Sequence, residues 1–311
     1  ADAGVADAGA SHVAATVAPL ETGKRPARVE PTIAPISTVQ DLVLVQHRAI
    51  ARVDRKALAS VIAADAFGFG TGAGDIAEGR DGMVAQLVRD LGDPPAGGFT
   101  VESKAISIGE DRGHAWIAEQ LEVGSAGVEP RSFAISELAA VIDGSWQVVA
   151  LHWATPVDDA TAQRLAMLSK LPQPARIVDR HDGPAEIDQA VRAAFASRAA
   201  FAEACSERAD AFNYGSGGER AHGPAIKRIF SRLKADIQVH DGVRVVGGGA
   251  WDPAQTTQPR IAWAALNVDY SAKTRAAAEV TQTFRVLAIL IKDGRGWKIV
   301  QTQWSNGGPI R

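Results

Sequence analysis

The chain contains one strand pattern twice, and this repetition restricts its fold more than any other feature. The two segments are WQVVALHW at residues 146–153 and WKIVQTQW at residues 297–304. Both begin and end on tryptophan and share a central valine, so they align without a gap. Self-similarity of this kind marks a duplicated structural unit. The rest of the chain should therefore hold further matches in the same order.

Three further anchors satisfy this expectation. The first is ADAFGFGTG at residues 64–72, which matches ADAFNYGSG at residues 209–217. The other two pairs are Gly79 with Gly223, and Trp116 with Trp263. The anchors follow one another in the same order, and their spacing drifts by only a few residues, within loops. We interpret the chain as a tandem duplication of one domain.

Hydrophobic periodicity predicts the elements of each copy. For the first copy we expect a helix at 37–53 capped by Ser37, a second helix at 54–66, a hairpin at 67–79, a third helix at 80–95 and strands at 99–109, 114–124, 131–143 and 145–154. For the second copy we expect two helices within 185–211, a hairpin at 212–223, a helix at 224–236 and strands at 242–252, 259–271, 278–294 and 296–304. This order predicts an α+β fold in which helices gather on one side of an antiparallel sheet.

These elements define four segments. Residues 1–36 lack aromatic residues and are rich in Ala, Pro, Gly, Thr and Val, so we expect a disordered low-complexity tail. Residues 37–157 form the first domain, called the first half below, and residues 184–311 form the second half. Residues 158–183 form a connector with a short helix. The tail's composition suits a tether, which favours an exported protein, either periplasmic or tethered, over a cytoplasmic one.

The motifs of both halves resemble SnoaL-like domains of the nuclear transport factor 2-like superfamily. The first half carries DAFGFGTGAGDIAEGRDGM, GHAWIAEQLEV and GSWQVVALHWA, and the second half carries DAFNYGSGGERAHGPAI, IAWAALNV and GWKIVQTQWSN. The resemblance implies a curved antiparallel sheet, of the cystatin-like type, that three helices wrap into a cone with a pocket at its open end. Such domains commonly pair through the outer face of the sheet. Two copies in one chain therefore predict an intramolecular pseudo-dimer.

The superfamily includes ketosteroid isomerases and polyketide cyclases, so the resemblance raises the question of catalysis. Isomerase chemistry needs a carboxylate base beside the acidic carbon of the substrate. The family pattern places this base at Gly70 in the first half and at Gly215 in the second half. Because glycine accepts no proton, the resemblance favours a non-enzymatic module.

One alternative keeps an enzyme in the first half. His152 on the last strand and Glu137 on the strand before it are candidates for a general base and its orienting partner in a cyclase, isomerase or hydrolase. The second half has Gln303 in place of His152, which cannot perform the same chemistry. The competing interpretation of His152 is an ordinary strand-end histidine.

The strands also predict an aromatic pocket for a small apolar ligand. In the register of the isomerases its lining residues are Trp116, Val149, Leu151, Trp153, Trp263, Val300, Thr302 and Trp304. The alternative is that these tryptophans fill the core of each cone. By the same register, the residues that face a partner sheet are Phe67, Phe69, Phe212 and Tyr214. A slip of one residue would exchange the two faces.

Composition excludes several other functions. With 33 basic against 36 acidic residues, the net charge is -3, and no basic run suits nucleic acid. No apolar stretch is long enough for a membrane span. No histidine or cysteine spacing predicts a metal site, and the glycine-rich turns lack the lysine of a phosphate loop. We therefore expect no cofactor, and a small apolar ligand or a protein as the partner. A purely structural scaffold is the third hypothesis.

Overall fold

The structure is a computed structural model that describes residues 35–158, 161, 164, 173–247, 260–273, 279–294 and 296–306. Most of the predicted tail and most of the predicted connector helix at 158–171 lie outside the described residues. So does the end of the predicted strand at 242–252. The described part forms an α+β fold with two sheets, as the sequence predicts at this level. No helix in this part combines the length and apolarity that crossing a bilayer requires.

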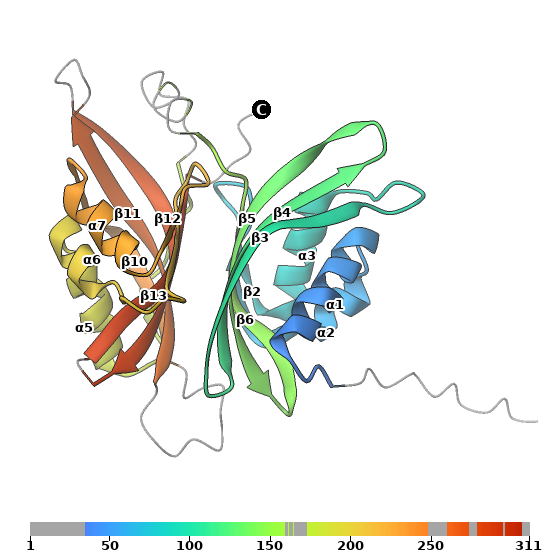
Figure 1. Cartoon of the computed structure of the whole chain (residues 1–311), viewed down its shortest axis with the longest axis horizontal. Coiled ribbons are helices and arrows are strands. Elements are labelled where there is room, and N and C mark those ends of the chain that lie inside the picture. The colour runs from blue at the N-terminus through green and yellow to red at the C-terminus, as the bar shows by residue number, and fades with distance from the viewer. Residues whose placement is uncertain are drawn as a thin grey trace, which may run out of the picture. The chain divides into compact units, whose positions relative to one another are not determined.

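Three helices cover one face of the first sheet (Figure 1). They are α1 (Val39–Arg52), α2 (Arg55–Ser60) and α3 (Gly79–Leu91). The cap of α1 is Thr38 rather than the predicted Ser37, because the Thr38 hydroxyl accepts the backbone N–H of Asp41 at 3.0 Å. Gly92 ends α3 with a φ of 73°, a value that glycine adopts without strain.

The first sheet has six strands in the order β2-β1-β6-β5-β4-β3. They are β1 (Ile62–Phe69), β2 (Ile76–Glu78), β3 (Thr100–Asp111), β4 (His114–Ser125), β5 (Val128–Ile142) and β6 (Ser145–Ala154). Hairpins join β3 to β6 in antiparallel pairs, but β1 pairs with β6 in parallel. The prediction of an antiparallel sheet is therefore incomplete, because the long connection between β1 and β6 does not impose the direction that a hairpin does.

The predicted helix at 54–66 is too long. The helix ends at Ser60, and the apolar residues that follow start β1, where Ile62 and Ala63 are buried. A short apolar run is compatible with a buried helix or a buried strand, and here pairing with β2 and β6 decides for the strand.

The second sheet has its own three helices, again on one face (Figure 1). They are α5 (Ala185–Ala194), α6 (Arg198–Ala204) and α7 (Pro224–Arg232). The strands are β7 (Arg180–His181), β8 (Phe212–Tyr214), β9 (Arg220–His222), β10 (Ala235–Gly247), β11 (Ile261–Lys273), β12 (Glu279–Asp293) and β13 (Gly296–Ser305). Their order is β7-β10-β11-β12-β13-β8-β9. The sequence prediction missed β7 and started β10 seven residues late, at 242 instead of 235.

Side chains of β13 donate hydrogen bonds to the first sheet. Gln301 Nε2 reaches the carbonyl oxygen of Ile117 at 2.7 Å, and Gln303 Nε2 reaches that of Ala134 at 2.9 Å. Trp263 also stacks on Phe67 with 5.1 Å between ring centroids. Gln303 therefore acts as a contact between the two sheets.

Arg285 on β12 makes the most extensive of these contacts. Its side chain is fully buried, and its guanidinium donates to the carbonyl oxygens of Gly70, Gly72 and Asp75 at 2.8, 2.7 and 3.2 Å. It also donates to Ser305 Oγ at 3.1 Å. One cation thus satisfies the backbone of the turn between β1 and β2 from the other sheet.

Candidate functional site

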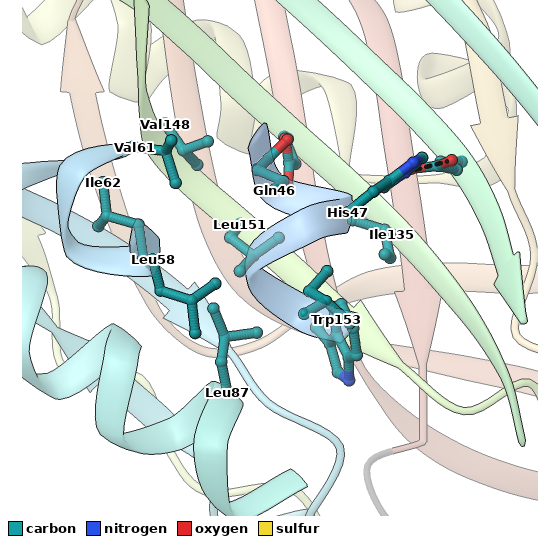
Figure 2. A pocket seen from close by; sticks show the side chains of 13 residues that line it. Gln46, His47, Leu58, Val61, Ile62, Leu87, Ile135, Val148, Leu151 and Trp153 are labelled. Atoms are coloured by element: carbon teal, nitrogen blue, oxygen red, sulfur yellow. Dashed lines mark hydrogen bonds and ion pairs between the residues drawn. The ribbon is translucent and has the colours of Figure 1, made fainter. Parts of the chain in front are cut away.

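A pocket lies between the helices of the first half and the six-stranded sheet (Figure 2). Its enclosed volume is about 20 Å³, which is room for one water molecule. Five lining residues belong to helices, a sixth directly follows α2, and the other seven belong to strands. The lining comprises Gln46, His47, Ile50, Leu58, Val61, Ile62, Leu87, Glu119, Ile135, Glu137, Val148, Leu151 and Trp153.

Most of this lining is apolar. Leu58 and Leu87 come from the helices, while Leu151 and Trp153 come from β6 (Figure 2). Trp153 is 2% exposed and lies 4.6 Å from the ring of Phe133, measured between centroids. These walls suit an apolar molecular surface.

The other end of the pocket is polar and begins with a buried carboxyl group. Glu137 on β5 is 6% exposed. The side-chain amide of Gln46 on α1 donates to both of its carboxyl oxygens, at 2.8 and 3.0 Å. The donor is neutral, so this contact satisfies hydrogen bonding without supplying a counter-charge.

A second carboxyl group lies beside the first. His47 Nε2 lies 3.1 Å from Glu119 Oε2 and 3.0 Å from Glu119 Oε1 (Figure 2). The Glu119 side chain is 6% exposed, whereas that of His47 is 20% exposed. His47 therefore connects the buried carboxyl pair with the outside of the pocket.

Burial raises the pKa of Glu137 to about 7. This value already includes the Gln46 hydrogen bond, which lowers the pKa, the charge of Glu119, which raises it, and the charge of His47, which lowers it. A carboxyl group with such a pKa exchanges its proton near neutral pH, as a general acid or base must.

The sequence analysis missed Gln46, His47 and Glu119. Each carries a readable signal. Gln46 and His47 lie three and four residues after the buried Val43, on the inward stripe of α1. Glu119 shares one face of β4 with Ile117 and Leu121, which are buried. A charged residue on such a buried face is rare unless it has a partner.

The raised pKa of Glu137 predicts a specific pH dependence of stability. Between its ordinary value of about 4.5 and about 7, the folded protein keeps a proton that the unfolded chain has lost. The free energy of unfolding therefore falls as pH rises through this window, by an amount on the order of 3 kcal/mol. Glu137→Gln is expected to remove this decrease, as measured by urea unfolding at pH 4.5 and 7.5. Glu110→Gln, at an exposed position of β3, should keep the wild-type dependence, and equal slopes in all three proteins would contradict the prediction.

The predicted lining residues of the first half divide between two faces. Leu151 and Trp153 line the pocket, but Val149 does not, and Val148 takes its place. The reason is a β-bulge: Leu138 pairs with Ala150 and Ala139 pairs with Val148, which leaves Val149 as an extra residue.

Trp116 is not a lining residue either. Its indole N–H donates to the carbonyl oxygen of Asp210 at 2.9 Å, and the guanidinium of Arg208 lies 5.2 Å from its ring. Trp116 therefore faces residues of the second half. Gly109 permits its position, because a Cβ atom there would overlap the indole.

The structure does not bring His152 and Glu137 together. Ser136 pairs with His152 and Glu137 pairs with Leu151, so the two candidates point to opposite faces of the sheet. His152 Nε2 lies 2.8 Å from Ser305 Oγ, outside the pocket. Burial and the neighbouring charge of Arg285 lower the pKa of His152 well below its usual range.

The predicted lining residues of the second half are all buried. Trp304 lies among the rings of Phe195, Phe201, Phe230 and Phe284, at centroid distances of 5.6 to 6.2 Å. The remaining three residues, Trp263, Val300 and Thr302, are each at most 1% exposed. No member of this set contributes to the pocket described above.

The aromatic residues predicted to face a partner sheet do contact residues across the two sheets. Phe67 stacks on Trp263, and the guanidinium of Arg285 lies 5.2 Å from the ring of Phe69. Phe212 and Tyr214 form a cluster with Ala118 and Ala134 of the first sheet.

Neither glycine at the expected isomerase base belongs to the pocket. A Cβ atom at Gly70 would overlap Gln86, and its carbonyl oxygen accepts from Arg285. Gly215 lies beside Glu219. Among the residues that the structure describes, no group of three or more His, Cys, Asp or Glu side chains is placed to hold a metal ion.

One comparison with known proteins finds a match in the first half. Residues 39–158 match a family model described as a SnoaL-like domain. This match agrees with the predicted resemblance to a SnoaL-like domain for this part of the chain. No curated protein matches.

Several solved structures are similar to part of the chain. A nuclear transport factor 2-like protein from Pseudomonas putida KT2440 is 17% identical, covers 40% of this chain and 88% of its own, and has a TM-score of 0.36. A protein with a cystatin-like fold from Nostoc punctiforme PCC 73102 is 17% identical, covers 41% and 98%, and has a TM-score of 0.33. Another from Caulobacter vibrioides is 17% identical, covers 42% and 95%, and has a TM-score of 0.32.

Proposed function

We propose that the chain is a small-molecule-binding module and that the first half holds the binding site. The observation that carries this proposal is a pocket that combines apolar walls with a buried polar end at Gln46, His47, Glu119 and Glu137. Small-molecule sites commonly join many apolar contacts to a few placed polar groups. The apolar walls come from Leu58, Leu87, Leu151 and Trp153 rather than from a set of four tryptophans.

Binding of anything larger than water requires the pocket to widen. An outward shift of α1 would break the contacts of Gln46 and His47 with the sheet and the hydrogen bond from the Phe99 N–H to the Ala51 carbonyl oxygen. It would enlarge the cavity without breaking a strand pair. We infer that α1 acts as the movable wall. Ligand binding should therefore slow amide hydrogen exchange in α1 more than in β4 or β5.

Native mass spectrometry of the protein purified from its own host tests this function. The expected result is a retained small molecule that is lost when Trp153 is replaced by alanine. Trp304→Ala is the matched control, because it removes the corresponding tryptophan of the second half and should leave the bound mass in place. The bare chain mass in the wild type, together with no stabilisation by any member of a metabolite library, would overturn the proposal.

We also propose that residues 37–157 and 184–311 are two SnoaL-like domains that dock as an intramolecular pseudo-dimer. The shared element order supports this interpretation, as do the hydrogen bonds from Gln301, Gln303 and Arg285 to the first half. Small-angle scattering should fit one compact particle. A profile of two independently reorienting lobes would contradict the docking.

The second half is proposed to serve mainly as structural support. Trp263 pairs with Ile289 as Trp116 pairs with Leu138, so the strands can be compared position by position. Counting from these tryptophans, Leu266 stands where the first half has Glu119, and Ala288 stands where it has Glu137. The polar end of the pocket is thus missing from the second half.

Acid–base catalysis in the same pocket is the second candidate function. The pKa of about 7 at Glu137 and the neighbouring His47–Glu119 pair favour it, with Glu137 as the base in place of His152. Solvent deuterium exchange into small cyclic ketones tests this function. Exchange by the wild type that disappears in Glu137→Gln would support catalysis, and equal rates in both proteins would exclude Glu137 as the base.

Two broader proposals rest on the sequence. The composition of residues 1–36 supports a tether on an exported protein. Fractionation of the native host would test this by showing which compartment holds the chain.

The second of these proposals is that the partner is a protein in place of a small molecule. Affinity capture from the host that depends on Trp153 but yields no small molecule would favour that form of the module.

A further inference from the structure

We propose that the pocket selects a small organic cation, namely a protonated primary amine with an apolar body. The inference rests on the proposed binding function and adds the charge class of the ligand. It follows from three features of the polar end: an excess of carboxylate groups, an unused acceptor atom and adjoining apolar walls.

The first feature is an excess of carboxyl groups over cationic side chains. Two buried carboxyl groups, Glu119 and Glu137, face one histidine, His47, and one neutral amide, Gln46. In the part of the chain that the structure describes, no Lys or Arg forms an ion pair with either carboxyl group. Among the described residues Glu119 has the ion pair with His47, whereas Glu137 contacts only the neutral amide. Buried charges in proteins are normally paired, and a cationic ligand would supply a partner for Glu137.

The second feature is an acceptor atom without a donor. Glu119 Oε1 is buried and accepts no hydrogen bond among the described residues, although it lies 3.0 Å from His47 Nε2. That ring nitrogen carries at most one hydrogen atom, and Glu119 Oε2 can accept the hydrogen bond that it donates. An ammonium group has three donors and can therefore serve Glu119 Oε1 and Glu137 at once.

The third feature is the position of the apolar walls. Trp153, Leu151 and Ile135 line the same pocket as the carboxyl pair. A primary amine with an apolar body would place its charge at the carboxyl groups and its body against these walls. A carboxylate ligand would meet like charges, and a purely apolar ligand would leave the buried acceptor unsatisfied.

The protonation state of Glu137 in the ligand-free protein makes the affinity for an amine depend on pH. Burial raises the pKa of Glu137 to about 7, and the charges that act on it are Glu119 from β4 and His47 from α1. An ammonium group binds the ionised form, so binding below this pKa releases a proton. The affinity for an amine should then rise by up to tenfold per pH unit towards pH 7 and level off above it.

Calorimetric titration with benzylamine and benzyl alcohol tests the inference, because the two probes share one shape and differ in charge. At pH 8 the wild type should bind benzylamine at least tenfold more tightly than benzyl alcohol. Glu137→Gln should abolish this preference and its pH dependence while keeping the affinity for benzyl alcohol. Glu110→Gln, an exposed carboxyl group on β3, should behave as the wild type does.

The outcomes separate the inference from the function on which it rests. Equal binding of both probes by the wild type would overturn the charge selectivity and leave small-molecule binding intact. A preference for benzylamine that survives in Glu137→Gln and also in Glu119→Gln would likewise overturn it. Binding of neither probe would overturn the amine proposal, while the retained mass in the native protein would still decide the function. Should Glu137→Gln fail to fold, Glu119→Gln gives the same comparison.

Discussion

Replacing Arg285 by methionine is expected to lower the free energy of unfolding by about 4 kcal/mol. The substitution keeps much of the apolar stem but removes the donors for the carbonyl oxygens of Gly70, Gly72 and Asp75. Buried acceptors that lose their donor cost about 1–3 kcal/mol each, and water can reach some of them only if the sheets separate. Thermal and urea unfolding measure the loss.

The effect should be specific to the contact between the sheets. Burial lowers the pKa of Arg285 to about 10, so the side chain stays charged at neutral pH and its donors are all available. Arg228→Met, at an exposed position of α7, is the matched control and should change stability by less than about 0.5 kcal/mol. A similar small change in Arg285→Met would mean that the turn at Gly70 does not depend on the second half.

The element order could be predicted because similar sequence patterns follow one another in the same order in both halves, so the interpretation of one half could be checked against the other. Helix boundaries were less secure, since the residues at 62 and 63 are compatible with both a helix and a strand until their partners are known. The two-residue strand β7 carries no periodicity at all, and its existence depends on pairing with β10. The local hydrophobic pattern therefore predicts which helices and strands form, while strand pairing decides at which residues they begin and end.

The candidate site was harder to predict, because it depends on which side chains meet across the sheet. Alternation along β6 puts Leu151 and Trp153 on one face, and both line the pocket, but a bulge at Val149 shifts the positions before it. Strand order alone allows the side chains of His152 and Glu137 to meet. Their actual register puts them on opposite faces, and α1 rather than β6 supplies the partners of Glu137.

Trp304→Ala is expected to cost about 3–5 kcal/mol of unfolding free energy, which is the usual effect of deleting a buried aromatic side chain. Trp304 contacts four phenylalanine rings in the second half, and its indole N–H lies 3.2 Å from Asn213 Oδ1. The alanine variant would leave a cavity at the centre of this cluster. Calorimetry and urea unfolding measure the cost.

The same variant separates packing from binding, because Trp304 and Trp153 occupy matching places in the repeat. Trp304→Phe retains a ring and should lose about half as much stability or less. At temperatures where both variants remain folded, neither should change benzylamine affinity, whereas Trp153→Ala should lower it. This difference between the Trp304 and Trp153 variants is expected if the second half stabilises the first half structurally and binds no ligand itself. Loss of benzylamine binding in a folded Trp304→Ala protein would instead assign a binding role to the second half.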